Sequence, residues 1–182
     1  MSEIKGKKGF TIIEVVLVLA IAGLIFLMVF IALPALQRSQ RDTQRRDDLA
    51  RVATAITQYQ TNNSGKIPGQ GASADIKSAV IASGTCSAST INDATKLLCG
   101  YLNSSEAASA GTNEFIDPDG TDYSITIKKV GTYASPTTVD HIVYIHPKAK
   151  CEGEKAVASD NNRDYAIVYK LEGTGTYCSD NR

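Results

Sequence analysis

The sequence predicts an α+β fold, in which a long N-terminal α-helix packs on a small antiparallel β-sheet. An uncharged apolar run from Val15 to Leu33, and an amphipathic pattern that follows it, predict one helix from about Phe10 to Thr61. Three strand-like segments in the last third of the chain predict the sheet. The length of 182 residues allows one globular domain with a modest core plus one long element.

The apolar run is long enough to cross a bilayer. Val15–Leu33 holds 19 residues without a charge. At ~1.5 Å per residue it spans ~30 Å, which is the thickness of a hydrocarbon core. A cleaved signal peptide has a shorter apolar region, of roughly 7–15 residues. Basic residues flank both ends of the run, so the positive-inside rule favours a cytoplasmic N-terminus by a small margin. We expect a membrane span.

The second half of the predicted helix has one apolar face. Apolar residues recur there at helical spacing: Leu49, Val52, Ala53, Ile56 and Tyr59. Two acid–base pairs are spaced i,i+4 with the acid first: Asp42 with Arg46, and Asp47 with Arg51. That order is the favourable one on a helix. We expect the apolar face to pack on the sheet and the helix to stop at residues 62–65, where Asn, Ser and Gly follow one another.

A short motif stands where the basic leader meets the apolar run. Gly9 ends the leader, Phe10 opens the run, and Glu14 stands fifth counting from Phe10. A charge inside a transmembrane helix costs about 2.5–3.5 kcal/mol at the bilayer centre, so such residues usually find a partner. The arrangement resembles the class III signal peptide of type IV pilins and pseudopilins.

The resemblance implies that a membrane prepilin peptidase cleaves between Gly9 and Phe10, and that the new N-terminal Phe10 is N-methylated. Cleavage would create a cationic α-amine four residues before Glu14. That amine could neutralise the carboxylate within one chain, or pair with a neighbouring chain and set the register of a filament. The alternative is a plain signal-anchor protein, in which Glu14 lies near the headgroup boundary.

Pro34 interrupts the long helix. Proline removes one backbone hydrogen bond and clashes with the preceding turn, which costs about 3 kcal/mol in a helix interior. We predict a kink at Pro34, for which two interpretations stay open. It is either an ordinary kink of a membrane helix or, as the resemblance implies, part of a segment that kinks or melts when subunits leave the bilayer for a filament.

The resemblance also implies a division of the chain into parts. Residues 63–116 are rich in small and polar residues and contain two apolar patches, Ile76–Ile81 and Ala94–Leu102. The second patch is typical of a short helix, with capping oxygens at Asn92 and Asp93. The expected parts are the leader (1–9), a transmembrane and filament-core helix (10–36), the amphipathic half of that helix (37–62), and a globular pilin head (63–182) with a connector (63–116) and a sheet with a disulfide-bounded region (117–182).

A turn motif precedes the predicted sheet. Asp117, Pro118, Gly120 and Tyr123 are spaced as in the turn found before the first strand in many pseudopilins and pilins, which this segment resembles. Aspartate caps such a turn, proline fixes φ, and glycine supplies a positive φ. The strands predicted after it are Tyr123–Lys128, His141–His146 and Arg163–Leu171. Local spacing favours antiparallel pairing, with residues 148–162 as a turn region.

Four cysteines lie beyond the apolar run: Cys86, Cys99, Cys151 and Cys178. An even number in an exported domain favours two disulfides, although four cysteines allow three connectivities. Zinc sites need paired C-x₂₋₄-C spacings, which are absent from the sequence. We predict the sequence-local pairing, Cys86 with Cys99 and Cys151 with Cys178. Pilins often carry a disulfide-bounded region of the second kind near the C-terminus.

Composition and motifs give no sign of catalysis or of a cofactor. Lys+Arg and Asp+Glu are balanced at 19 each, so no basic face for nucleic acid follows from charge. No Ser/His/Asp set, Walker loop or paired catalytic carboxylates stands out, and we expect a protein that is not an enzyme. The two histidines, His141 and His146, lie five apart in a strand-like stretch, which predicts that they point to opposite faces and bind no metal together.

A calcium site in the turn is the one metal hypothesis. Its candidate ligands are Asp117, Asp119 and Asp122, three carboxylates in six residues around a glycine. Position 12 of this loop is Lys128, where an EF-hand has a bidentate glutamate. We therefore favour a structural turn over a metal site.

The resemblance implies a structural subunit of a type IV pilus, serving adhesion, twitching motility or DNA uptake. It would be a single-pass protein of the inner, cytoplasmic membrane before assembly, and then part of an extracellular filament. Its partners would be the prepilin peptidase, the pilus assembly machinery, membrane lipid and other copies of the chain; a surface or DNA ligand is left open. Two alternatives remain, namely a type II secretion pseudopilin and a membrane-anchored binding protein that never polymerises.

Overall fold

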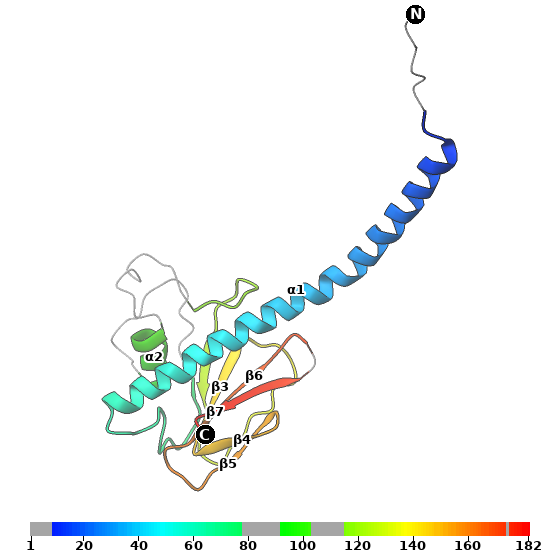
Figure 1. Ribbon diagram of the computed structural model, residues 1–182. Helices are drawn as coiled ribbons and strands as arrows, with labels where there is room; N and C mark the ends of the chain where they lie inside the picture. The colour runs from blue at the N-terminus through cyan, green and yellow to red at the C-terminus, as the bar shows by residue number, and fades with distance from the viewer. Residues whose placement is uncertain (1–8, 78–91, 103–114, 174) are drawn as a thin grey trace, which may run out of the picture. The chain divides into compact units, whose positions relative to one another are not determined.

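The computed structural model describes residues 9–77, 92–102, 115–173 and 175–182 of the chain. Its longest element is helix α1 (Ile12–Asn62), and strands that follow it in the chain form a mostly antiparallel sheet (Figure 1). This confirms the predicted α+β fold. The chain divides into two compact units, Met1–Ser39 and Gln40–Arg182. We call the second unit the head, and α1 belongs to both units.

The part of α1 in the first unit is apolar and exposed. Among the described residues, α1 is the one helix long and apolar enough to cross a membrane, and none of its most apolar 18-residue window is buried. The helix assignment continues through Pro34. Because the chain offers these side chains no apolar neighbours within the described residues, they are available to lipid or to other proteins.

The part of α1 in the head is amphipathic, as predicted. Four residues of the expected stripe are buried, Ala53 is partly buried, and Ala55 joins them. The buried apolar residues of this half are Leu49, Val52, Ala55, Ile56 and Tyr59. Burial of such side chains contributes about 1.5–3 kcal/mol each, so the stripe fixes this half of α1 to the head.

The ion pairs predicted on this helix are not the ones formed. Arg45 pairs with Asp42 at 3.1 Å and Arg51 pairs with Asp48 at 3.4 Å, and both pairs are spaced i,i+3. The predicted i,i+4 partner of Asp42, Arg46, lies over the ring of Tyr177 instead, with its Cζ 5.7 Å from the ring centroid. The reason is tertiary: an exposed i,i+4 pair contributes only ~0.3–0.5 kcal/mol, which contacts with the head easily exceed.

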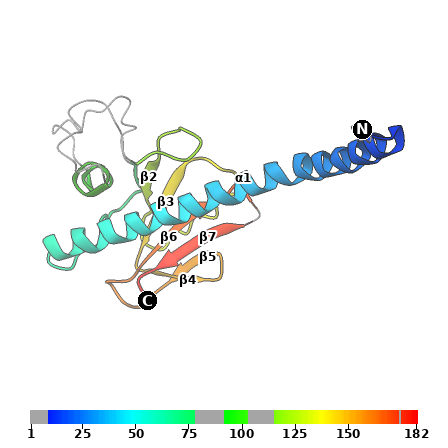
Figure 2. The same ribbon diagram turned by 45° about the horizontal axis from the view of Figure 1, so that its top comes forward.

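Five strands form the main sheet, in the order β1-β2-β3-β6-β7 (Figure 2). Their bounds are β1 (Ile76–Lys77), β2 (Ser124–Ile127), β3 (Ile142–Pro147), β6 (Tyr165–Lys170) and β7 (Thr176–Asp180). Three of the four pairings are antiparallel, but β2 and β3 are parallel, with Ser124 opposite Ile142. The expectation of antiparallel pairing is wrong for this pair. Residues 128–141 are long enough to return to the starting end of the sheet, which a parallel pair requires.

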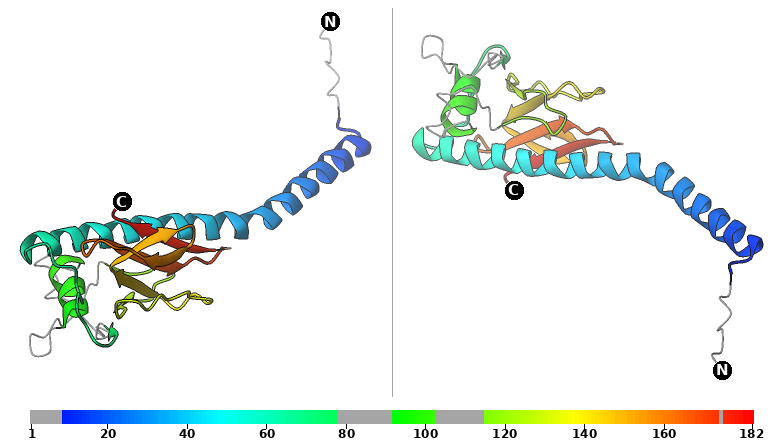
Figure 3. Two further views of the ribbon diagram at one scale, coloured as in Figure 1. Left: turned by 90° about the horizontal axis from the view of Figure 1, so that it is seen from below. Right: turned by 90° about the horizontal axis from the view of Figure 1, so that it is seen from above.

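The two faces of the sheet pack against different elements. Alternate residues on one face, among them Ile125, Ile145 and Ile167, join the buried stripe of α1 in one apolar core. Figure 3 shows the second half of α1 along this face. On the other face, Ala166 and Val168 pack with a smaller sheet of two strands, β4 (Ala149–Glu152) and β5 (Lys155–Ala158). This hairpin lies within residues 148–162, which were expected to be a turn region.

A short helix packs on the core close to Tyr59, near the C-terminal end of α1. Helix α2 (Asp93–Leu97) continues as the single π-helical turn η2 (Leu98–Leu102). Asn92 caps it, since its Oδ1 accepts a hydrogen bond from the backbone N of Thr95 at 2.8 Å. The predicted helix and its capping residue are thus present. Of the other apolar patch, Ile76–Ile81, the described residues form β1.

Candidate functional site

The leader junction lies in exposed chain before the helix. The backbone N–H groups of Glu14 and Val15 donate to Thr11 O at 3.1 and 3.3 Å, which starts the first helical turn. Phe10 is 84% exposed, and a Cβ on Gly9 would meet nothing within 4 Å. The Gly9–Phe10 bond is therefore outside regular structure and accessible, as the extended substrate of a protease must be.

Glu14 borders an apolar groove on the first unit. Phe10, Glu14, Val15, Val18 and Leu19 line an open groove of about 320 Å³ whose surface is almost entirely apolar. No ion pair to Glu14 forms among the described residues. A carboxylate beside apolar surface is stabilised by a cation that arrives together with apolar contacts. The chemistry of this segment therefore suits a second helix that carries a positive charge.

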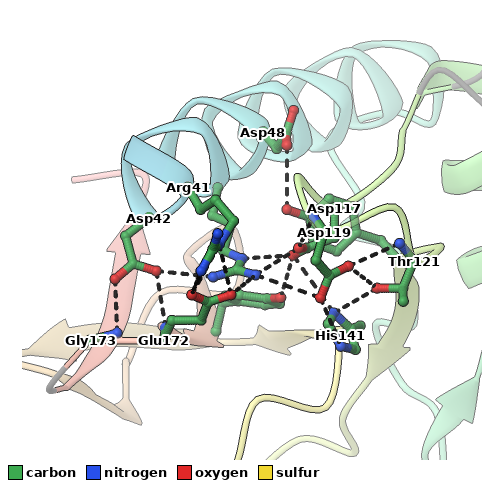
Figure 4. Close-up of polar contacts among 12 residues, drawn as sticks. Arg41, Asp42, Asp48, Asp117, Asp119, Thr121, His141, Glu172 and Gly173 are labelled. Atoms are coloured by element: carbon green, nitrogen blue, oxygen red, sulfur yellow. Dashed lines mark hydrogen bonds and ion pairs between the residues drawn. The ribbon is translucent and has the colours of Figure 1, made fainter. Parts of the chain in front are cut away.

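A buried arginine, Arg45, joins α1 to the rest of the head. Figure 4 labels the carboxylates that it contacts, Asp42, Asp117 and Glu172. The side chain of Arg45 is fully buried, and its Nε and Nη2 each donate to a carboxylate oxygen of Asp117 at 2.7 Å. Nη2 also donates to Glu172 at 2.9 Å, and Nη1 to Asp42 at 3.1 Å. A buried charge is tolerated only when it is paired and hydrogen-bonded, and this guanidinium donates hydrogen bonds to three carboxylates.

A second layer of contacts fixes those carboxylates. Arg41 holds Glu172 through Nε and Nη2, with the shortest contact at 2.7 Å. Tyr169 Oη donates to Asp117 Oδ2 at 3.0 Å. Asp42 accepts hydrogen bonds from the backbone N–H groups of Glu172 and Gly173, at 3.0 and 2.9 Å. The network therefore ties α1 to the turn before β2 and to the chain that leaves β6.

The pKa shifts in this network follow from burial and pairing. Burial alone would raise the pKa of Asp117, but the hydrogen bonds from Arg45, the backbone of Asp119 and Tyr169 hold its pKa at about 2, below its usual value. Hydrogen bonds to Asp117 and Glu172 outweigh burial and raise the pKa of Arg45. The pKa of Glu172 is lowered, chiefly by Arg41. All of these groups are therefore charged at neutral pH.

The predicted turn motif forms a closed turn. Gly120 N donates to Asp117 O at 2.8 Å, and Asp119 N donates to Asp117 Oδ1 at 3.1 Å. Gly120 has a φ of +92°, a conformation that suits glycine and few other residues. The buried aspartate thus has two roles, because it caps the turn and pairs with Arg45.

The three aspartates proposed as calcium ligands do not converge. The cluster that gathers within ligating distance is Asp117, Asp119 and His141, without Asp122. Both oxygens of Asp117 already accept hydrogen bonds from Arg45, and a divalent cation beside that guanidinium would be repelled. The residues present therefore fit a structural turn better than a Ca²⁺ site.

The two histidines lie in different environments. His141 Nδ1 is 2.9 Å from Thr121 Oγ1, and its Nε2 is 3.5 Å from Asp119 Oδ2. His146 is buried in β3, where Nδ1 lies 3.1 Å from Thr132 O and Nε2 has no hydrogen-bond partner among the described residues. Burial lowers the pKa of His146 to about 4.

One predicted disulfide is present in the described residues. Cys151 of β4 is bonded to Cys178 of β7, with 5.9 Å between the Cα atoms. This bond fixes the small sheet to the edge of the main sheet, and Asp180 reinforces it by accepting a hydrogen bond from Cys151 N at 2.7 Å. Cys99 is also disulfide-bonded. Its predicted partner, Cys86, lies outside the described residues.

Reasoning from the sequence missed the buried network. In the sequence, Arg41 and Arg45 are two of the basic residues that follow the apolar run, and no motif singles out Glu172. A signal was nevertheless present: Arg45 stands four residues before Leu49 and extends the apolar stripe by one turn. A charge in line with a buried stripe indicates a buried ion pair, although its partners come from distant parts of the chain.

Comparison with known proteins bears on the N-terminal segment. A family model described as the prokaryotic N-terminal methylation motif matches residues 4–30. This range contains Gly9, Phe10 and Glu14 together with most of the apolar run. No curated protein and no solved structure matches the chain. The chain carries the class III signal peptide of type IV pilins, and with its long apolar helix packed on a mostly antiparallel sheet it is pilin-like.

Proposed function

We propose that the chain is a structural subunit, a pilin, of a type IV pilus, which polymerises through its N-terminal helix. The observation that carries the proposal is an apolar, exposed stretch of α1 that bears a single acid and lies mostly within a methylation motif. An apolar helix with a charge of this kind is stabilised by packing among identical helices that each supply the opposite charge.

The leader junction would supply that charge. Cleavage between Gly9 and Phe10 leaves an α-amine on Phe10, one helical turn before Glu14. Methylation keeps the amine basic, so the pair attracts whether the amine belongs to the same chain or to a neighbour. A neighbour that places its amine at Glu14 would also cover the apolar groove formed with Val15, Val18 and Leu19. Charge and apolar contact would then fix one axial register.

The head would form the outside of the filament. Arg45 and its carboxylates hold the Gln40–Asn62 half of α1 on the sheet, so force applied to the helix reaches the sheet through ion pairs and packed side chains. The disulfide between Cys151 and Cys178 restrains the C-terminal strands in the same way. Adhesion, twitching motility and DNA uptake are the functions such a filament would serve.

The proposal is tested by purifying sheared surface appendages from cells that express the chain. We expect their main protein to lack residues 1–9 by intact mass and to begin with N-methylated Phe10. Gly9→Val should block cleavage and leave the full precursor in the membrane, whereas Gly6→Val, in the same leader, should be processed normally. A mature chain that begins at Met1, or beyond Pro34, contradicts the proposal. A correctly processed chain absent from appendages would favour the secretion pseudopilin.

A further inference from the structure

A polar cavity lies on the head where four segments meet. It is open to solvent, measures about 400 Å³, and is lined by Thr57, Gln60, Thr61, Gly65, Arg163 and Asn181. These residues come from the last turns of α1, the turn that follows it, the chain before β6 and the chain after β7. Arg163 is the one charged residue of this lining, so the cavity is electropositive.

The backbone of Arg163 is fixed from three sides. Its carbonyl accepts hydrogen bonds from Gln60 Nε2 at 3.2 Å and Asn181 Nδ2 at 3.1 Å, and its N–H donates to Asn161 Oδ1 at 3.1 Å. Each of the two amide groups has a second N–H, which these bonds do not use. The cavity therefore offers amide donors beside the guanidinium.

The guanidinium itself is placed by Gly65. A Cβ on residue 65 would lie 3.3 Å from both Nε and Nη2 of Arg163, so the guanidinium packs closely against the backbone of Gly65. Among the described residues no carboxylate forms an ion pair with Arg163. Four charged residues adjoin the lining in sequence: Lys66, Asp164, Asp180 and Arg182. The carboxylate of Asp164 is paired with Arg182 at 2.7 Å, and that of Asp180 accepts a hydrogen bond from Cys151 N at 2.7 Å. Nothing acidic in the lining competes for the guanidinium.

We propose that this cavity binds an oxyanion, a carboxylate or phosphate group carried on a small hydrophilic ligand. The planar fork of arginine matches both groups with two parallel hydrogen bonds, and the amides of Gln60 and Asn181 add donors to the same ligand. The hydroxyls of Thr57 and Thr61 donate to helix carbonyls at 3.0 Å. The oxygen of Thr61 can then accept a hydrogen bond from a hydroxyl group of the ligand. All of the residues that line the cavity belong to the head.

The test is calorimetric titration of the full mature chain in detergent at constant ionic strength, with inorganic phosphate, glucuronate and neutral galactose. We expect both anions to bind with Kd values of about 1–10 mM, as small ligands at an open site do, and galactose not to bind. Arg163→Gln should weaken both at least tenfold, and Arg163→Lys, which keeps the charge but not the fork, should have an intermediate effect. Lys155→Gln, an exposed cation outside the cavity, is the matched control.

The outcomes separate the sources of the oxyanion. Binding of phosphate alone assigns the cavity to phosphorylated ligands, and binding of glucuronate alone assigns it to carboxylates; either result supports the proposal. Binding that survives Arg163→Gln, equal binding of galactose, or no binding of either anion overturns it. Because the side chain of Arg163 is exposed, we expect the variant to keep the thermal stability of the parent, which circular dichroism verifies.

Discussion

Between Ile12 and Ser39, α1 leaves its apolar side chains exposed, whereas between Gln40 and Asn62 the same helix buries one face in the core of the head. Leu24 is 69% exposed, while Val52 and Ile56 are fully buried. The second half finds its apolar partners within the chain. The first half finds none among the described residues, which leaves it available to lipid or to other proteins.

The two halves also differ in whether their charged residues have partners among the described residues. Arg45, on the buried face of the second half, is paired with Asp117, Glu172 and Asp42. Glu14, in the first half, forms no ion pair with a described residue. A charge in an apolar environment needs a partner in either case. Folding of the head supplies the partners of one half of α1, and in the proposed function association would supply those of the other half.

The largest effect, a loss of filaments, is expected when the charge of the first half of α1 is removed. Glu14→Val should insert into the membrane and be cleaved, because an apolar residue is easier to bury, yet filaments should be lost or reduced to a small fraction. The unfolding free energy of the head should stay within ~0.5 kcal/mol of the parent, because Glu14 lies outside it. Electron microscopy of sheared material and denaturation in detergent measure the two effects.

Two results would contradict this expectation. Normal filaments built from Glu14→Val would show that the carboxylate does not set the register. A destabilised head would show that the two halves are coupled in folding. Glu152→Val, which removes an exposed head carboxylate, is the matched control and should assemble normally.

The next effect is expected from removing the charge of the second half. Arg45→Met keeps most of the side-chain volume but leaves Asp117 buried without its main partner. We expect a loss of about 3–5 kcal/mol in unfolding free energy, the usual cost of breaking a buried pair from one side. Urea denaturation followed by tyrosine fluorescence measures it. Arg46→Met, one position along the helix and exposed, should cost less than ~1 kcal/mol.

A double substitution sharpens that result. Arg45→Met with Asp117→Asn removes both charges, and it should recover part of the loss because the uncompensated carboxylate is gone. If the double variant is less stable than Arg45→Met by the full cost of Asp117→Asn alone, the two residues do not act as a pair. That result would contradict the role assigned to the network.

The disulfide in the head should have a smaller effect. Replacing Cys151 and Cys178 together by serine removes a cross-link between residues 27 apart. The chain-entropy relation then gives a loss of about 3–4 kcal/mol, as an upper figure for an unstrained bond. Denaturation curves of the double serine variant measure the loss, and membrane insertion and cleavage at Gly9 should be unchanged. Impaired cleavage would mean that the head affects the leader junction.

Local patterns accounted for much of the fold. The stripe of α1, the Asn92 cap and the turn at Asp117 each depend on residues within a few positions of one another, and the sequence indicates them directly. The parallel pairing of β2 and β3 does not, because it is decided by how residues 128–141 return across the sheet. The β4–β5 hairpin had a signal in its two-residue loop, Gly153-Glu154, but its strands are only four residues long and show no strong alternation.

The candidate site divides in the same way. Gly9, Phe10 and Glu14 form a contiguous motif, which a single segment of sequence is enough to recognise. Arg45 meets Asp117 across 72 positions and Glu172 across 127. No periodicity in the sequence links such distant residues. The buried network could therefore be suspected from the charge in the stripe, but its partners required the fold.

The smallest expected effect is a pH dependence of the unfolding free energy of the head, caused by His146. Burial holds its pKa at about 4, below the usual value near 6.5. As pH falls below 6.5, His146 becomes protonated in the unfolded chain but stays neutral in the folded head, so the unfolding free energy decreases. The decrease is complete once pH falls below about 4. Each pH unit in this window corresponds to at most ~1.4 kcal/mol, and we expect about 1–2 kcal/mol between pH 6.5 and 5. The groups that face the ring are the Thr132 carbonyl, Tyr133, Lys128 and Asp75.

Denaturation at several pH values measures this effect. A plot of unfolding free energy against pH should show a slope that His146→Gln removes. His141→Gln is the control, because it removes the other histidine and keeps His146. The part of the pH dependence that comes from His146 should remain in this variant. A slope unchanged by His146→Gln would assign the acid sensitivity to other groups of the head.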